Sequence, residues 1–201
     1  MARLNLPNII TTSRIILAFI TVGLLRIENY YTLIIAVFLI ILVVFLDFLD
    51  GYVARKLHMQ TEFGALYDIT GDRIVEYIYW IYFSVAHITS FWYAIIVIAR
   101  GEIVNTLRAT AYKKGKTPYQ IHKTKLARFL VASPFMRTSY AVLKAVTFSL
   151  MGIELFLRKK LPQFPYLHHV SVATSVLAFL VVAVCILRGL PVIIDTKDYI
   201  R

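Results

Sequence analysis

The sequence has little cysteine and little charge. Cys185 is the only cysteine among 201 residues, so no disulfide can form within the chain. Charged residues make up 16% of the chain, compared with about 25% in ordinary soluble domains. Apolar residues make up 59%, and mean hydropathy is +0.72. This shortage of polar surface excludes a soluble globular domain, a disordered region and a disulfide scaffold.

Acidic residues are also scarce, with 11 Asp and Glu against 22 Lys and Arg, which gives a net charge of +11. A nucleic-acid-binding protein would not combine such an excess with this hydropathy. In an apolar chain the excess indicates positive cytoplasmic loops and contacts with anionic lipid head groups. The N-terminal residues contain no cleavage pattern of the Ala-x-Ala type, and we expect the chain to be mature from Met1.

Long charge-free runs predict membrane helices, since about 20 residues span a bilayer core of about 30 Å. The run over residues 77–99 is interrupted by polar residues near His87, which predicts a turn between two helices. Pro134 predicts a kink within a single helix over residues 125–157. We therefore expect an all-α integral membrane protein with one domain over residues 1–201. Its six predicted transmembrane helices cover residues 8–25, 29–46, 62–86, 90–111, 125–157 and 170–187.

Basic residues in short loops predict the orientation, because cytoplasmic loops are enriched in Lys and Arg. Arg55 and Lys56 follow the second predicted helix, and both chain ends lie on the same predicted side. The run from Arg158 to Lys160 falls on the opposite side. More Lys and Arg lie on the side of Arg55 and Lys56, however, so we expect that side to be cytoplasmic. The connection after the fourth helix adds Lys113, Lys114, Lys116, Lys123, Lys125 and Arg128.

Four aspartates form the most informative pattern. Asp47 and Asp50 lie about 60° apart on one predicted helix, at about 100° per residue. Asp68 and Asp72 are one turn apart on the next helix and share a face. Two facing stripes of this kind would present four carboxylates to one another.

Carboxylates within a membrane helix are costly, at about 2.5–3.5 kcal/mol each near the centre, unless something compensates their charge. Divalent cations with oxygen ligands, Mg²⁺ or Mn²⁺, suit a set of aspartates, whereas zinc prefers His and Cys. In the alternative structural interpretation, the acids cap helices or pair with Arg55, Lys56 and Arg73. Four acids in register, with glycines and an arginine beside them, favour a functional cluster.

The spacing Asp-x2-Asp-Gly-x2-Ala-Arg-x8-Gly-x3-Asp-x3-Asp is met at every position from Asp47 to Asp72. It resembles the signature of the CDP-alcohol phosphotransferase family of membrane enzymes. The resemblance implies six helices around a polar cavity open to the cytoplasm, and two metal ions bound near the pyrophosphate of a CDP-linked lipid. It implies that Asp47, Asp50 and Asp68 are metal ligands, and that Asp72 is both a ligand and the catalytic base. The positions that would hold the cytidine diphosphate are Gly51, Ala54, Arg55, Thr61 and Gly64.

The first 130 residues resemble the phosphatidylglycerophosphate synthases, a branch of that family. On this resemblance Asn8 and Thr11 would reach the nucleotide, although an N-cap and a polar turn are the simpler interpretation of these two residues. It implies CDP-diacylglycerol as donor, glycerol 3-phosphate as acceptor and release of CMP by a homodimer in the cell membrane. The acceptor phosphate would be bound by Arg100, Arg108, Lys123 and Lys125. Arg137, which interrupts an apolar helix, is a further candidate contact to this phosphate.

Two departures keep other acceptors open. Arg73 stands where such synthases usually have Lys, and Gly101 separates Arg100 from Glu102 where they have Arg-Glu. Relatives that use inositol phosphate share the four aspartates and also need arginines for a phosphate, and an ether-linked donor is equally open. An ion-coupled transporter is the alternative from another class, but no inverted repeat is visible. A purely structural membrane protein would leave the carboxylate cluster unexplained.

Overall fold

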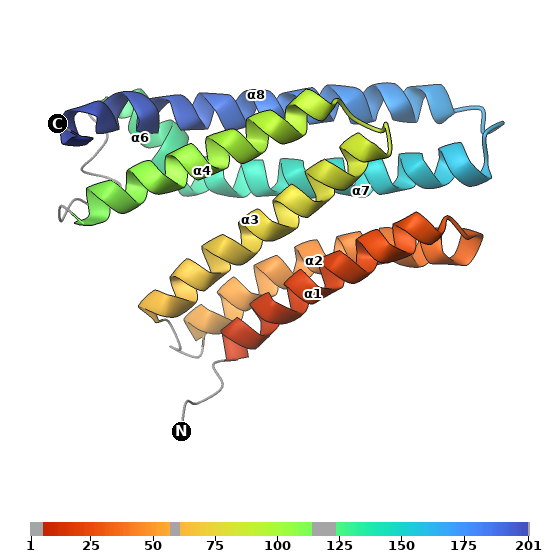
Figure 1. The fold of residues 1–201 in the computed structure, drawn as a ribbon, viewed down its shortest axis with the longest axis horizontal. Helices are drawn as coiled ribbons and strands as arrows, with labels where there is room; N and C mark the ends of the chain where they lie inside the picture. The colour runs from red at the N-terminus through yellow and green to blue at the C-terminus, as the bar shows by residue number, and fades with distance from the viewer. Residues whose placement is uncertain (1–5, 57–60, 114–123, 201) are drawn as a thin grey trace. The chain divides into compact units, whose positions relative to one another are not determined.

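The computed structural model describes residues 6–56, 61–113 and 124–200, and every regular element in these ranges is a helix (Figure 1). The predicted all-α class is therefore confirmed. The helices are α1 (Leu6–Ile27), α2 (Tyr30–Lys56), α3 (Glu62–Val85), α4 (Phe91–Lys113), α6 (Lys125–Ala132), α7 (Pro134–Lys160) and α8 (Leu167–Ile200).

The turn expected near His87 is present between α3 and α4. His87 adopts a φ of 55°, in the left-handed region that reverses the chain, and its amide donates to the Ser84 carbonyl at 3.2 Å. A similar turn joins α1 to α2 at Glu28, with a φ of 54°. The connection between α1 and α2 is short, and these two helices contact each other as an antiparallel pair.

The single kinked helix predicted over residues 125–157 is wrong, because the chain breaks there into α6 and α7. Ser133 has an extended backbone, with φ −61° and ψ 129°, between the two helices. The ring of Pro134 disfavours helical geometry at the preceding residue, so it ends one helix and begins the next. Thr124 caps α6, since its hydroxyl accepts from the Ala127 amide at 3.1 Å.

Four helical segments among the described residues are long and apolar enough to cross a membrane. Their outward faces carry large apolar side chains, such as Phe38, which is 65% exposed. These are the properties of a multi-pass membrane protein. Helices α3 and α4 are not among these four segments, and the prediction of six spans around a polar cavity stays a prediction. The four segments are Leu6–Ile27, Tyr30–Asp47, Pro134–Lys160 and Leu167–Asp195.

Contacts divide the chain into two compact units, and the single domain expected over residues 1–201 stays a prediction. The first unit contains residues 1–88 and 148–172, and the second contains residues 89–147 and 173–201. In the second unit, the core forms around Val104, Val131 and Val192 from α4, α6 and α8.

The first unit holds α1, α2 and α3 together with the second half of α7. Helix α1 contacts both α2 and α3 (Figure 1). Gly152 on α7 lies so close to α2 that an added Cβ would be 2.8 Å from the Ile40 side chain. Trp80 of α3 is fully buried and packs edge-on against Phe148 at 5.6 Å between ring centroids. This packing fixes the register of the helices that carry the aspartates.

Candidate functional site

Three of the predicted aspartates come together in the first unit. Asp47 lies on α2 after its long apolar stretch, and Asp68 and Asp72 lie one turn apart on α3. One carboxylate oxygen from each lies within 4.8 Å of the other two. Their side chains are 41%, 42% and 44% exposed, so the cluster is open to a ligand. The side chain of Asp50 lies outside the described residues.

A fourth residue, Arg14 of α1, lies at the centre of the cluster. Its side chain is 1% exposed. Nη1 donates to Asp47 Oδ1, and Nη2 donates to Asp72 Oδ1 at 2.6 Å and to Asp68 Oδ1 at 3.3 Å. A buried guanidinium is tolerated only with such pairing, and it offsets part of the repulsion among the three carboxylates.

No role was predicted for Arg14 from the sequence, although a signal was present. Arg14 is the only charged residue in α1 before Arg26. It lies on the buried face of α1. The buried residues of this face recur every three or four positions, as is typical of a helix face packed against the protein. A charge on such a stripe indicates a partner within the protein. The buried stripe consists of Pro7, Thr11, Arg14, Ala18, Thr21 and Leu25.

Close contact between α1 and α3 lets Arg14 reach the carboxylates. A Cβ added at Gly71 would lie 2.6 Å from Thr11 Cγ2 and 3.5 Å from Arg14 Nη2. Real side chains do not tolerate the first distance, so glycine is required for this approach. The hydroxyls of Thr12 and Tyr67 are hydrogen-bonded at 2.8 Å and join the same two helices on the side open to solvent.

The three carboxylates fit a divalent metal ion. Each contributes an oxygen, the ligand that Mg²⁺ and Mn²⁺ prefer, and the oxygens converge within a few ångströms of one another. The cluster can therefore hold one such ion, with the remaining coordination positions left to water or substrate. The expectation of two ions stays a prediction.

The family model described as CDP-alcohol phosphatidyltransferase matches residues 4–185, which is most of the chain. The chain belongs to the CDP-alcohol phosphatidyltransferase family. The match includes α1, α2 and α3 and therefore the whole carboxylate cluster.

Curated relatives within the family share about a third of their residues with this chain. A protein of Wigglesworthia glossinidia brevipalpis is 37% identical over 121 residues, covering 57% of this chain and 64% of the relative. A protein of Haemophilus influenzae is 35% identical over 111 residues, covering 53% and 58%. Both carry the name CDP-diacylglycerol–glycerol-3-phosphate 3-phosphatidyltransferase. The chain thus spans about three fifths of the length of these relatives.

The residues predicted to hold the nucleotide have local structural roles where they are described. Thr11 is 2% exposed, and its hydroxyl donates to the Pro7 carbonyl at 3.1 Å. The Asn8 carbonyl accepts from the Thr12 hydroxyl at 2.8 Å, and the Asn8 side chain is half-buried. The α3 cap is Thr61, whose hydroxyl accepts from the Gly64 amide at 2.9 Å. Gly51, Ala54 and Arg55 lie in the last turns of α2, where side chains are outside the described residues.

The residues predicted to bind the acceptor belong to the second unit. Arg100 and Arg108 lie on α4, and Arg137 lies in the first turn of α7 with an exposed side chain. Lys125 is the first residue of α6, and Lys123 lies outside the described residues. Their predicted proximity to Asp72 stays a prediction.

Gly189 of α8 makes room for Arg100 within the second unit. A Cβ added at Gly189 would lie 2.8 Å from Arg100 Nε and 3.0 Å from its Cγ. The side chain of Arg100 is therefore partly enclosed by α8, and its orientation depends on Gly189, for which the sequence predicted no role.

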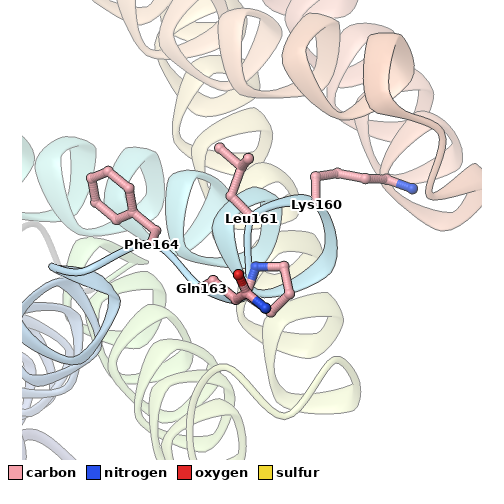
Figure 2. A pocket seen from close by; sticks show the side chains of 5 residues that line it. Lys160, Leu161, Gln163 and Phe164 are labelled. Carbon is pink, nitrogen blue, oxygen red and sulfur yellow. The ribbon is translucent and has the colours of Figure 1, made fainter.

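A cavity of about 350 Å³ lies elsewhere in the first unit, at the connection between α7 and α8 (Figure 2). Figure 2 shows that the Lys160 amine extends away from Gln163. No carboxylate lines this cavity, so it offers no cation site. The cavity is lined by Lys160, Leu161, Pro162, Gln163 and Phe164.

Proposed function

We propose that this protein transfers a phosphatidyl group from CDP-diacylglycerol to glycerol 3-phosphate and releases CMP. The observation that carries the proposal is the convergence of Asp47, Asp68 and Asp72 on α2 and α3, which both contact α1, in a membrane protein of this family. The names of the relatives support this donor and acceptor. A membrane-embedded protein can take a lipid donor directly from the bilayer.

In the proposed reaction, the acceptor hydroxyl oxygen bonds to the phosphorus that carries the diacylglycerol. The bond from this phosphorus to the bridging oxygen of the pyrophosphate breaks, and that oxygen leaves with its electron pair as part of CMP. The hydroxyl proton passes to the Asp72 carboxylate, which is open enough to meet an acceptor.

The other carboxylates organise the donor. Asp47, Asp50 and Asp68 would hold Mg²⁺ or Mn²⁺ together with Asp72, with two ions per site. When bound, these ions neutralise charge on the pyrophosphate and on the departing CMP. The carboxylates themselves fix the position of the donor relative to Asp72, so that the reacting atoms meet in line.

The nucleotide is bound, in this proposal, between the starts of α1 and α3 and the end of α2. Arg55 supplies a bidentate contact to a phosphate oxygen. Small residues leave space for the cytidine diphosphate. Hydroxyl and amide groups form hydrogen bonds to it with the donor and acceptor capacity that their contacts within the protein leave free. The residues proposed for these contacts are Asn8, Thr11, Gly51, Ala54, Thr61 and Gly64.

The acceptor phosphate is bound by cationic side chains of the second unit. A dianionic phosphate is best met by several Lys and Arg side chains that act together. We propose that these groups lie on the cytoplasmic side of the cell membrane, where the Lys- and Arg-rich connections also lie. Association into a homodimer belongs to the same proposal. The phosphate-binding residues are Arg100, Arg108, Lys123, Lys125 and Arg137.

The identity of the acceptor is tested by competition among small alcohols, two with a phosphate group and one without. Purified protein is given CDP-diacylglycerol, Mg²⁺ and equal concentrations of radiolabelled glycerol 3-phosphate, inositol phosphate and serine, and labelled lipid products are separated. We expect glycerol 3-phosphate to be incorporated at least tenfold faster than either competitor. Preference for inositol phosphate would change the acceptor and keep the phosphate pocket. Preference for serine would contradict the pocket, because serine has no phosphate to bind.

A further inference from the structure

We propose that Arg14 is a built-in counter-ion that occupies the carboxylate cluster when no metal is bound and is displaced by the divalent cation. This inference rests on the proposed metal-dependent function and adds a second occupant to the same site. In this arrangement the free enzyme keeps its aspartates together without metal, and the affinity for the metal is set by competition with an internal cation.

The contacts place the guanidinium on the oxygens that a metal needs. Arg14 donates to Oδ1 of Asp47, Asp68 and Asp72, the three residues whose oxygens converge. A divalent ion held by the same three carboxylates would compete with these N–H bonds for the carboxylate oxygens. A guanidinium and a divalent ion on the same carboxylates would also repel each other strongly, because the surroundings are partly desolvated. Simultaneous occupancy in the described geometry is therefore unfavourable.

The backbone near Arg14 is held firmly, so the exchange falls to the side chain. Gly71 permits the close approach of α1 to α3, and the Thr12–Tyr67 hydrogen bond joins the same helices. The guanidinium ends a side chain with several rotatable bonds. It can therefore leave the oxygens that bind the ion, and stay close enough to the carboxylates to remain paired, without movement of α1. The aspartates, by contrast, have short side chains and stay in place for the incoming ion.

Charge explains why a counter-ion is needed. Three carboxylates with oxygens within 4.8 Å of one another repel. Arg14 is 1% exposed, so solvent ions cannot readily take over its role. Removal of its charge leaves the aspartates uncompensated in the metal-free protein. The same removal eliminates the competitor of the metal. Stability without metal and affinity for metal should therefore change in opposite directions.

The test compares Arg14→Gln with the wild-type protein in detergent micelles. The concentration of free Mn²⁺ is measured by electron paramagnetic resonance, which gives the dissociation constant of the Mn²⁺ complex. Thermal unfolding is followed in EDTA and in saturating Mn²⁺. We expect Arg14→Gln to bind Mn²⁺ about tenfold more tightly or better, since a repulsive charge is removed. Its unfolding midpoint should be well below that of the wild type in EDTA and should approach it in Mn²⁺.

Two further variants make the result specific. Arg26→Gln removes the same charge from the last turn of α1 and should leave Mn²⁺ affinity unchanged. Arg14→Lys keeps a charge but has one donor group in place of a fork, so its affinity should lie between the wild type and Arg14→Gln. If folded Arg14→Gln protein can be purified only in the presence of Mn²⁺, the metal has replaced Arg14, as proposed. If no folded Arg14→Gln protein can be purified, the Mn²⁺ affinity of Arg14→Lys, compared with that of the wild type, provides the test.

Unchanged or weaker Mn²⁺ binding in both Arg14 variants would overturn the inference. Failure of the proposed function has a different signature. In that case the wild-type protein would bind no Mn²⁺, or Asp68→Asn would bind it as well as the wild type. Binding that is lost in Asp68→Asn but not improved by Arg14→Gln would contradict the counter-ion alone.

Discussion

The Asp68→Asn variant is expected to lose turnover by about a thousandfold or more while the protein still folds. Asparagine keeps the size of the side chain but removes its charge, and with it a metal ligand from the cluster. A factor of a thousand corresponds to about 4 kcal/mol of lost transition-state stabilisation, which is within the range for metal-assisted charge neutralisation. Initial rates of CMP formation at saturating Mg²⁺ measure the loss, and helix content by circular dichroism checks the fold.

A matched control separates the cluster from acids in general. Glu28 lies in the turn after α1, is 46% exposed and pairs with Lys159 at 2.9 Å. Glu28→Gln removes one carboxylate charge outside the cluster and should keep at least half of the wild-type rate, as an exposed ion pair contributes little. Near-normal turnover of Asp68→Asn, or full turnover of the wild type in excess EDTA, would refute the metal assignment.

The second large effect is expected for Arg108→Ala, in the use of the acceptor. A hydrogen bond to a charged group contributes about 1.5–3 kcal/mol, so the KM for glycerol 3-phosphate should rise by about 10- to 150-fold. The kcat should change little, because a phosphate remote from the reacting hydroxyl contributes mainly uniform binding. Steady-state kinetics with each substrate varied in turn separate these parameters.

The donor supplies the internal control for this variant. The KM for CDP-diacylglycerol should stay within about twofold of the wild type, and Arg108→Lys should fall between the wild type and the alanine variant. Equal increases in both KM values would indicate a general disturbance of the fold. An unchanged acceptor KM would remove Arg108 from the phosphate site.

The sequence predicted the helices well because their signals are local. Charge-free runs of membrane length have few alternatives to helix, and the turn at His87 interrupts one such run visibly. The effect of Pro134 was harder to predict, because a proline within an apolar stretch is compatible with a kinked helix as well as with two separate helices. The choice depends on the backbone of Ser133, which lies in the extended region and separates α6 from α7.

The site was predictable where spacing along one helix determines geometry. The four-residue spacing of Asp68 and Asp72 is enough to place both on one face. Their meeting with Asp47 depends on the contacts that α1 makes with both α2 and α3. Arg14 was not found, because its role depends on how deeply α1 approaches α3. That approach depends on Gly71, a residue without a side chain and hence without a recognisable sequence signal.

Hydroxyl groups show a further limit of sequence reasoning. The family resemblance implied nucleotide contacts for Thr11 and Thr61, and the described structure gives each a partner in the backbone. Thr11 bonds its own helix, and Thr61 caps α3. A hydroxyl that accepts from an amide can still donate to a ligand, so the two roles are compatible for Thr61. Residue type alone does not distinguish them.

The central claim is that the aspartate cluster catalyses attack of a phosphorylated alcohol on a CDP-linked lipid. The most direct measurement follows ³¹P signals of CDP-diacylglycerol in micelles with purified protein. The account predicts that CMP and a new phosphodiester signal appear together, only when Mg²⁺ and glycerol 3-phosphate are both present, and not with Asp72→Asn. Loss of the pyrophosphate signal without acceptor or metal, or an unchanged donor with every phosphorylated alcohol supplied, would contradict it.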